Sequence, residues 1–481
     1  MISRSPAVAR PLLYSGPMRT VLTPIALIAL VLAIGCGTDD AGVEPDADAG
    51  VVPATYTWHQ DVAPIVHGSC VTCHVAGGIA PFALDDYEDA QPVAGLMSFM
   101  VDGGEMPPWG AESSDDCAPR HNWVKDPRLT EEQKEILRVW ADEGAPEGDP
   151  DTAVPLPNAE PRELSGVTHT IAMPQPYTVP AGYNDKLVCT VIDPGLTSAR
   201  WLTGLEVTPG NDKVVHHVVL TVVPAAQRAE LEGRMGPDGT FECFGGIGVE
   251  GLYPLGVWVP GGDPFETPDG IGVPMAAGSA ILMQMHYHPS IEADESDRTT
   301  AQLRLTPTFP GKNFTFAGVG NAPSAPILQS GPNDRGVAEF RIPANVSGHT
   351  ETMIFDIDNE QTQRFPMFAV FPHMHYVGVE LEVHIERATP NPGEPAEECL
   401  VNVERWDFDW QRTYLYDADL EDLPTIGNGD TITIRCSYDN TLANPFVKRA
   451  LQEQGLTDPV DVLLGEETLD EMCLAAFGVI F

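Results

Sequence analysis

The sequence has few basic residues for its size, and this shortage excludes several kinds of partner. Its 481 residues include 26 Lys and Arg against 70 Asp and Glu, for a net charge of −44. A surface this acidic repels the phosphates of nucleic acids and of anionic membranes. We therefore expect the protein to bind neither of them. A hydrophobic content of 43% still permits folded cores.

The chain also lacks an apolar run of the length that crosses a membrane. Residues 21–34 are apolar but fall short of the ~20 residues that a spanning helix needs. They follow several arginines and precede a small residue and Cys36, which predicts a signal peptide over 1–36. Residues 32–36 resemble a bacterial lipobox, so we expect a periplasmic or cell-surface lipoprotein anchored through Cys36. Simple secretion and an uncleaved anchor are the alternatives.

Residues 37–54 are small and acidic and predict a flexible tether. The next segment carries one CxxC motif and no second one, which disfavours a zinc site. The motif is Cys70–Val71–Thr72–Cys73–His74, the attachment pattern of a c-type haem. We expect Cys70 and Cys73 to bind the haem covalently and His74 to ligate the iron.

A sixth iron ligand needs a second donor. Met106 lies on a loop stiffened by two prolines, and a thioether there favours reduced iron. Met97, Met100 and His67 are the competing candidates. We predict Met106.

Helices are expected on both sides of the motif. Residues 58–69 have apolar side chains at helical spacing, and residues 130–143 begin with a capping box and end at a glycine. This plan resembles a class I cytochrome c, so we expect a small all-α haem domain over 55–150.

The rest of the chain alternates apolar and polar residues in short runs, after a proline-rich linker over 145–160. Such runs predict an antiparallel β architecture. They cover residues 214–223, 279–287, 301–306, 366–371, 380–385 and 430–438.

Three histidine pairs lie in or beside these runs, and buried imidazoles are costly unless they are bonded or bind a metal. The pairs are His216 with His217, His286 with His288, and His373 with His375. Residues two apart on a strand share a face, so the third pair can hold one metal. The adjacent first pair can act together only if the strand ends or bulges there.

The ligand types narrow the choice of metal. Imidazole suits Zn, Cu, Fe and Ni, while a thioether shifts the preference to Cu(I). No carboxylate is interleaved with these histidines, which disfavours a non-haem iron site. These residues predict copper.

The ordered motifs HH, QxHY, HxHxxG and EMC resemble the copper type II, ascorbate-dependent monooxygenases, which include peptidylglycine α-hydroxylating and dopamine β-hydroxylating enzymes. The resemblance covers most of 160–481. It implies two copper ions, one bound by three imidazoles and the other, oxygen-binding one by two imidazoles and a thioether. The first set is His216, His217 and His286, and the second is His373, His375 and Met472.

The same resemblance implies two disulfides, Cys189–Cys243 and Cys436–Cys473. Cys117 and Cys399 match no position of the family and either pair with each other or stay free. His288 and His349 are expected not to be ligands.

The implied fold is two all-β antiparallel, jelly-roll-like sandwich domains, over 160–308 and 309–481. Each would carry one copper, and the two would face each other across a cleft. With the haem domain, this makes a multidomain chain of one small α domain and two β domains.

The expected function is hydroxylation of a C–H bond of a small organic substrate by O2, with electrons supplied by a reductant or a periplasmic donor through the haem. Phe371, Leu474 and Ala476 replace the residues that hold a peptide carboxylate in the amidating enzymes, which favours an apolar or neutral substrate. The alternative is a copper- and haem-binding electron-transfer or copper-carrier lipoprotein without oxygenase activity.

Overall fold

The computed structural model describes residues 55–76, 80–157, 163–182, 185–243, 247–259, 264–290, 293–358, 361–466 and 469–481. Strands account for 35% of the chain and helices for 16%. Ala54–Phe481 forms one compact unit. The predicted signal peptide, the tether and Cys36 lie outside the described residues.

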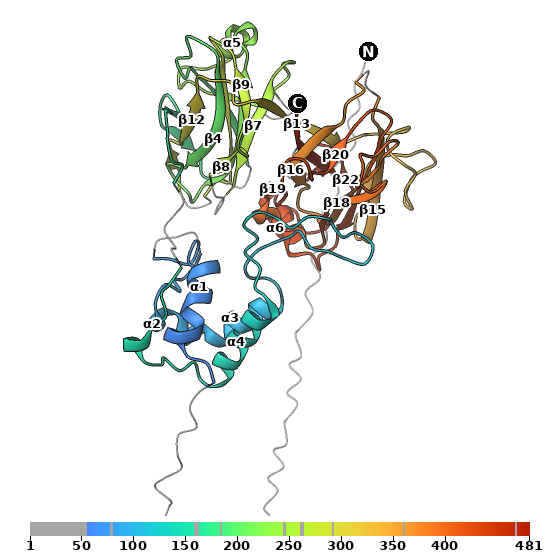
Figure 1. Cartoon of the computed structure of the whole chain (residues 1–481). Coiled ribbons are helices and arrows are strands. Elements are labelled where there is room, and N and C mark those ends of the chain that lie inside the picture. The colour runs from blue at the N-terminus through green and yellow to red at the C-terminus, as the bar shows by residue number, and fades with distance from the viewer. Residues whose placement is uncertain are drawn as a thin grey trace, which may run out of the picture. The chain divides into compact units, whose positions relative to one another are not determined.

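Helices form at both predicted places in the segment 55–150. A π-helical turn, Trp58–Val62, continues into α1 (Ala63–Ser69). Thr130 caps α4 (Glu131–Asp142) through the reciprocal bonds of a capping box with Gln133. The other described α-helices are α2 (Tyr87–Ala90), α3 (Ala94–Asp102), α5 (Ala225–Glu232) and α6 (Pro445–Glu453). Figure 1 shows α1 to α4 grouped together.

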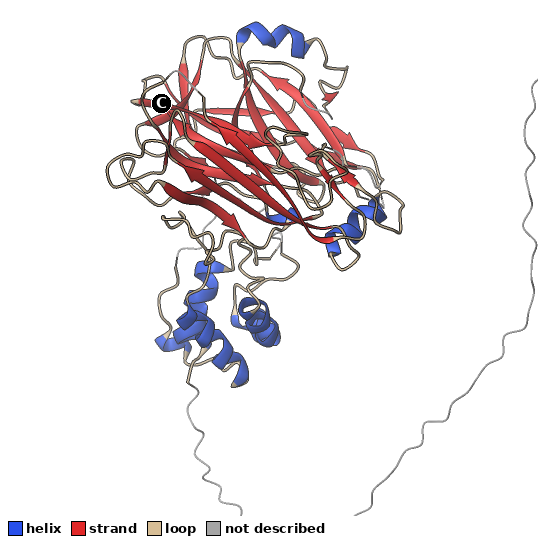
Figure 2. Cartoon of the chain, turned by 90° about the vertical axis from the view of Figure 1, so that its right-hand side faces the viewer, coloured by secondary structure: helices blue, strands red, loops and turns tan. Residues whose placement is uncertain are grey.

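Strands dominate the remaining chain (Figure 2). The largest sheet has the order β1 (His169–Ala172), β12 (Thr300–Thr306), β4 (Arg200–Thr208), β9 (Ile271–Met275), β13 (Lys312–Gly320), β23 (Leu474–Ile480), β16 (Phe365–His373) and β19 (Tyr414–Leu415). In the same sheet, β8 (Phe265–Glu266) pairs with β4 and β20 (Thr425–Ile426) pairs with β16.

A second sheet has the order β6 (Phe241–Glu242), β3 (Lys186–Ile192), β10 (Ala280–Tyr287), β5 (Val215–Val223) and β7 (Tyr253–Trp258). A third has the order β15 (Ser347–Asp356), β21 (Thr431–Asp439), β17 (Gly378–Glu386) and β18 (Glu397–Val403). Two further pairs are β11 (Glu295–Asp297) with β2 (Tyr177–Val179) and β14 (Arg341–Ile342) with β22 (Val462–Leu463).

Period-two patterning explains why these runs form strands. Along β12, buried residues alternate with half-buried ones, as expected when one face of a strand lies on a core. The central strand β10 is buried over nearly its whole length, because it pairs with β3 on one side and β5 on the other.

The predicted all-α cytochrome c domain is wrong. Residues 103–128 carry no helix, because Gly103, Gly104 and the two prolines after Met106 interrupt helical structure. The segment instead pairs with C-terminal strands through the bridges Ala111 to Val403 and Trp123 to Tyr416. The helices therefore belong to the same compact unit as the sheets.

The β strands on the two sides of residue 308 belong to one compact unit. The largest sheet runs across the expected boundary near residue 308, where β9 and β13 pair in parallel with Lys312 opposite Ile271. Apolar residues from both sides of this boundary join one large core. The two sets of histidines consequently lie in one continuous structure.

Candidate metal centres

The three-histidine set forms where β5 and β10 lose their regular register. His286 on β10 lies opposite His217, but the next residue, Tyr287, lies opposite Val215. His216 is thus the extra residue of a β-bulge, which turns its side chain toward that of His217. The ring centroids of His216 and His217 lie 5.0 Å and 4.6 Å from that of His286. The bulge that the sequence required for an adjacent pair is present.

Three nitrogen atoms converge in this set. The Nδ1 of His217 lies 3.3 Å from the Nδ1 of His216 and 3.3 Å from that of His286. Ligands about 2.0 Å from a metal in a trigonal plane would be about 3.5 Å apart, so the spacing fits one ion. Burial lowers the pKa of His216 and, further, that of His217, so both imidazoles are neutral and have a free lone pair.

Asp185 orients His286 of the three-histidine set through the ring nitrogen that faces away from the other two histidines. Its carboxylate accepts a hydrogen bond from His286 Nε2–H at 3.0 Å and another from His288 Nδ1 at 3.0 Å. The first bond leaves Nδ1 of His286 as the free acceptor that a metal needs. Although burial opposes the shift, the bonds from the two histidines lower the pKa of Asp185, which stays ionised. His288 is thus bound to Asp185, as expected for a non-ligand.

Replacing Asp185 with Asn should weaken copper binding by the three-histidine set by about 10- to 100-fold, the usual cost of losing such an orienting carboxylate. Competition with a chromophoric Cu(I) chelator measures the affinity. Asp212→Asn is the matched control, because it removes an exposed carboxylate from the same wall of the cavity beside His216. Equal affinity in wild type and Asp185→Asn would contradict the role of this carboxylate.

The two-histidine set lies at the end of β16. The spacing predicts both histidines on one strand. His373 is the last residue of β16, but His375 lies just beyond the end of the strand. Their ring centroids are 5.2 Å apart. His373 Nδ1–H donates to Gln411 Oε1 at 2.7 Å, and His375 Nδ1–H donates to the Asp470 carbonyl at 3.1 Å. Both bonds leave Nε2 free for a metal.

The turn after His373 is held by Glu471. This buried carboxylate accepts the backbone N–H groups of His375, Val377 and Met472. Gly378 is needed in the same turn, because a Cβ there would lie 2.9 Å from the Cβ of Met374. Burial lowers the pKa of His373 to about 4 and that of His375 to about 3, so both are neutral near pH 7.

Met472 belongs to the same end of the sheet. His373 lies opposite Leu474 where β16 pairs with β23, and Met472 is two residues before Leu474. The next residue, Cys473, forms a disulfide with Cys436. The carbonyl of Met472 accepts a hydrogen bond from the Tyr438 hydroxyl. These contacts fix the backbone of the thioether residue beside the two histidines.

The two histidine sets meet at Phe408. The His216 ring stacks on this phenyl ring at 5.1 Å, and the His375 ring meets it edge-on at 6.3 Å. The adjacent Asp409 lies 3.7 Å from Nε2 of His216 and forms a bidentate ion pair with Arg449. One aromatic side chain therefore contacts both sets.

The CxxCH motif follows α1. Cys70 and Cys73 form no disulfide, whereas the other described cysteines are all disulfide-bonded. Burial, with Cys73 nearby, raises the pKa of Cys70 to about 12, which is opposite to the low-pKa thiolate of a redox CxxC pair. His74 Nδ1–H donates to the Phe82 carbonyl at 3.0 Å, which leaves Nε2 for iron.

The residue predicted as sixth ligand lies in the same apolar cluster as the motif. Met106 and Cys70 both pack against this cluster, whose buried members include Val71 and Met97. Nε2 of His67 is hydrogen-bonded to the Asp85 carbonyl, which makes this histidine a weaker candidate. The Met106 thioether and the Cys70 thiol against one apolar cluster, with His74 four residues after Cys70, fit a c-type haem.

The disulfides follow the resemblance and resolve one open question. Cys189 pairs with Cys243, Cys436 with Cys473, and Cys117 with Cys399. Three disulfides indicate folding in an oxidising compartment, so the chain is exported. Within the described ranges, no helix has the length and apolar character to cross a membrane.

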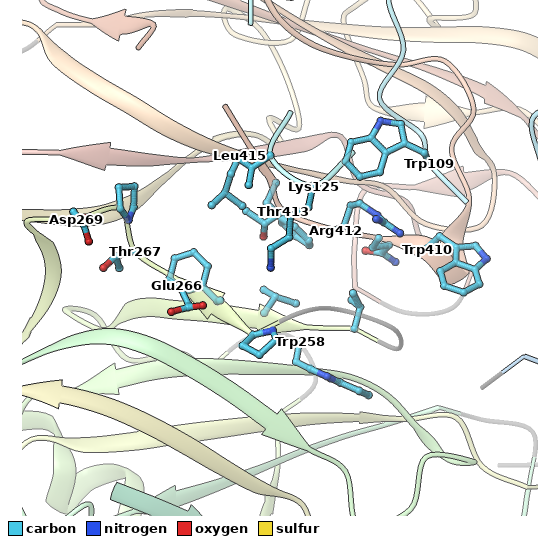
Figure 3. A pocket seen from close by; sticks show the side chains of 18 residues that line it. Trp109, Lys125, Trp258, Glu266, Thr267, Asp269, Trp410, Arg412, Thr413 and Leu415 are labelled. Carbon is cyan, nitrogen blue, oxygen red and sulfur yellow. The ribbon is translucent and has the colours of Figure 1, made fainter. Parts of the chain in front are cut away.

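A cavity of about 480 Å³ lies next to the two-histidine set. Phe371, two residues before His373, and Gln411 line it. Figure 3 shows Trp109 and Trp410 at one end and Glu266 and Asp269 at the other. It can receive a small organic molecule.

Sequence reasoning missed Asp185, Gln411, Glu471 and Phe408. Only Glu471 had a signal in the sequence, because it belongs to the EMC motif. A second group that could bind a metal, Cys117 with Glu382 and His384, has its cysteine in a disulfide and so lacks a thiolate. His349 is buried against Glu351 and Asn333, which accounts for it without a metal.

No known protein family and no curated protein sequence matches the chain. Several solved structures show limited similarity, and two are given as examples. The empty top-component particle of cowpea mosaic virus is 10% identical, with a TM-score of 0.26 over 69% of this chain and 95% of the viral chain. PNGase F, a glycosylasparaginase from Flavobacterium meningosepticum, is 9% identical, with a TM-score of 0.19 over 66% of this chain and 91% of the other. Similarity at this level carries no functional argument.

Proposed function

We propose that the chain is a copper-dependent monooxygenase that hydroxylates a C–H bond of a small organic substrate with O2. The observation that carries this proposal is the convergence of two neutral imidazole sets on Phe408, one set at a bulge and the other at a strand end. Copper bound there would supply one-electron redox chemistry and the activation of O2.

The side chains have distinct roles in this proposal. His216, His217 and His286 hold one copper through Nδ1, and Asp185 keeps His286 in the required tautomer. His373 and His375 hold the other through Nε2, with Met472 as the thioether that favours Cu(I). The order of these ligands along the chain, similar to that of the copper type II monooxygenases, supports the assignment.

We infer that a c-type haem on Cys70, Cys73, His74 and Met106 passes electrons from an external reductant to the copper sites. Two observations support this inference: Cys70 and Cys73 are the described cysteines that form no disulfide, and the hydrogen bond of His74 Nδ1 leaves its Nε2 for iron. The haem would supply one-electron transfer. Hydroxylation requires two electrons and two protons per O2, with one oxygen atom entering the substrate and the other leaving as water.

The cavity beside Gln411 is the proposed substrate site. Lys125 and Arg412 also line it, but its aromatic residues, and Phe371 at the position where the amidating enzymes have an arginine, suit an apolar or neutral molecule. Ethylbenzene is therefore a suitable probe, and a peptide ending in glycine is the contrasting probe.

The test is turnover of ethylbenzene by the haem- and copper-loaded protein under ¹⁸O2 with excess reductant. The proposal expects 1-phenylethanol that carries ¹⁸O, and no hydroxylation of the peptide. Consumption of O2 without labelled product from ethylbenzene or a wider panel of apolar molecules would favour an electron-transfer or copper-carrier protein.

We also infer that Cys36 carries a lipid, because residues 32–36 resemble a lipobox. Cys36→Ser should release the protein from the membrane fraction of a bacterial host into its soluble exported fraction, since the single anchor is lost. Fractionation followed by immunoblotting measures this change. An equal membrane share for both proteins would contradict the lipid anchor.

A further inference from the structure

The segment that carries Met106 is firmly attached to C-terminal strands. Beyond the bridge from Ala111 to Val403, the backbone N–H of Glu112 donates to the Asn402 carbonyl at 2.9 Å. The N–H of Val124 donates to the Leu415 carbonyl at 2.8 Å. Between these two hydrogen bonds along the segment, Cys117 forms a disulfide with Cys399. A loop fixed at several points keeps one position relative to the strands.

Within this attachment, a short bonded path joins Met106 to His373. Two residues after Met106, the carbonyl of Pro108 accepts a hydrogen bond from Arg412 Nη2 at 3.1 Å. Arg412 is covalently joined to Gln411, whose Oε1 accepts from His373 Nδ1 at 2.7 Å. Apart from covalent bonds, only two hydrogen bonds separate the thioether residue from the imidazole.

Gln411 and Arg412 border the cavity of about 480 Å³, and both side chains are held there by further contacts. Gln411 is 4% exposed, and its amide donates to the Phe408 carbonyl at 3.0 Å. The Arg412 guanidinium lies 4.9 Å from the centre of the Trp109 ring, which meets Tyr414 edge-on at 5.0 Å. Each contact restricts the motion of the arginine.

The three-histidine set is one step further along this path. His216 is reached through Phe408, which also contacts His375. Coupling between distant sites passes most directly through contiguous bonded contacts, so the two-histidine set is the nearer acceptor for an electron that leaves the Met106 side.

We propose that electrons from the haem enter the copper pair at His373 and His375, through the Met106 loop, Arg412 and Gln411. This proposal rests on the proposed function and adds the order in which the two copper sites receive electrons. With haem and copper bound, each transfer would oxidise one ferrous iron to ferric and reduce one cupric ion to cuprous. No bond is made or broken and no proton moves.

The experiment uses full-length protein with haem and copper bound, without O2 or substrate. A photoactivated reductant produces ferrous haem, and its reoxidation is followed by visible absorbance while the cupric signal is followed by electron paramagnetic resonance. The double variant His216→Ala, His217→Ala should lose the cupric signal of the three-histidine set, and its haem should still be reoxidised by the copper at His373 and His375. In the double variant His373→Ala, His375→Ala, haem reoxidation should be slower by about tenfold or more.

A matched pair of arginine variants tests the path itself. Arg412→Met should slow reoxidation about tenfold, and Arg412→Lys should restore part of the rate because it keeps a donor. Arg405→Met should stay within about twofold of wild type, because Arg405 bonds the same loop at Gly103 but is not joined to Gln411. Copper content in each variant must equal that of wild type.

Two results would overturn the route and are distinguishable. If reoxidation survives loss of His373 and His375 but stops on loss of His216 and His217, the route is wrong while the haem remains the electron donor. If wild-type haem is not reoxidised by either cupric ion, the donor role in the proposed function fails together with the route.

Discussion

Replacing His373 and His375 with alanine removes one of two bound copper ions and reduces hydroxylation to the level of copper-free protein. The reason is that both imidazoles of the second set are lost, and Met472 alone is too weak a ligand to keep the ion. Copper is counted by elemental analysis after dialysis against limiting free copper, and activity is measured as ¹⁸O-labelled product.

The control for this prediction removes the same number of imidazoles elsewhere. The control variant, His169→Ala with His384→Ala, changes two half-buried histidines that belong to neither set, one on β1 and one on β17. That variant should keep both copper ions and full turnover. Unchanged copper content in the His373 and His375 variant would mean that these residues are not ligands.

Replacing Cys70 and Cys73 with serine leaves the chain without covalent haem. Thioether bonds can form only from these two thiols, because the other described cysteines are in disulfides. Haem that stays with the polypeptide through denaturing electrophoresis is the measurement, in protein made by a host that matures c-type cytochromes. Covalent haem that persists in the serine variant would contradict the site.

A companion pair of variants distinguishes the sixth ligand. Met106→Leu should lower the reduction potential of the haem, because the thioether that favours ferrous iron is lost. Met97→Leu is the matched control, since Met97 is buried in the same cluster. A drop in potential for Met97→Leu alone would assign the ligand to that residue.

The histidine sets could be predicted because their chemistry is local. The spacing of His373 and His375 predicts a shared site, and the adjacency of His216 and His217 requires the bulge that the structure contains. The residues that orient them could not be predicted. Asp185 and Gln411 meet their histidines only after the chain folds, at separations of 101 and 38 residues.

The prediction of the fold class was wrong for a related reason. The helices at 58–69 and 130–143 follow from local periodicity, but what lies between them depends on distant partners. Cys117 pairs with Cys399 at a separation of 282 residues, and no local sequence pattern predicts that disulfide. The expected separate α domain is therefore part of a larger unit. The same contacts create the path from Met106 to His373.

The most direct test of the central claim is the metal content of the purified, exported protein. Copper, zinc and iron are counted per chain after maturation of the haem and dialysis against limiting free copper. The account predicts two copper ions and one iron per chain, with copper falling to one in the His373 and His375 variant. Zinc in place of copper, or no copper at either histidine set, would contradict it.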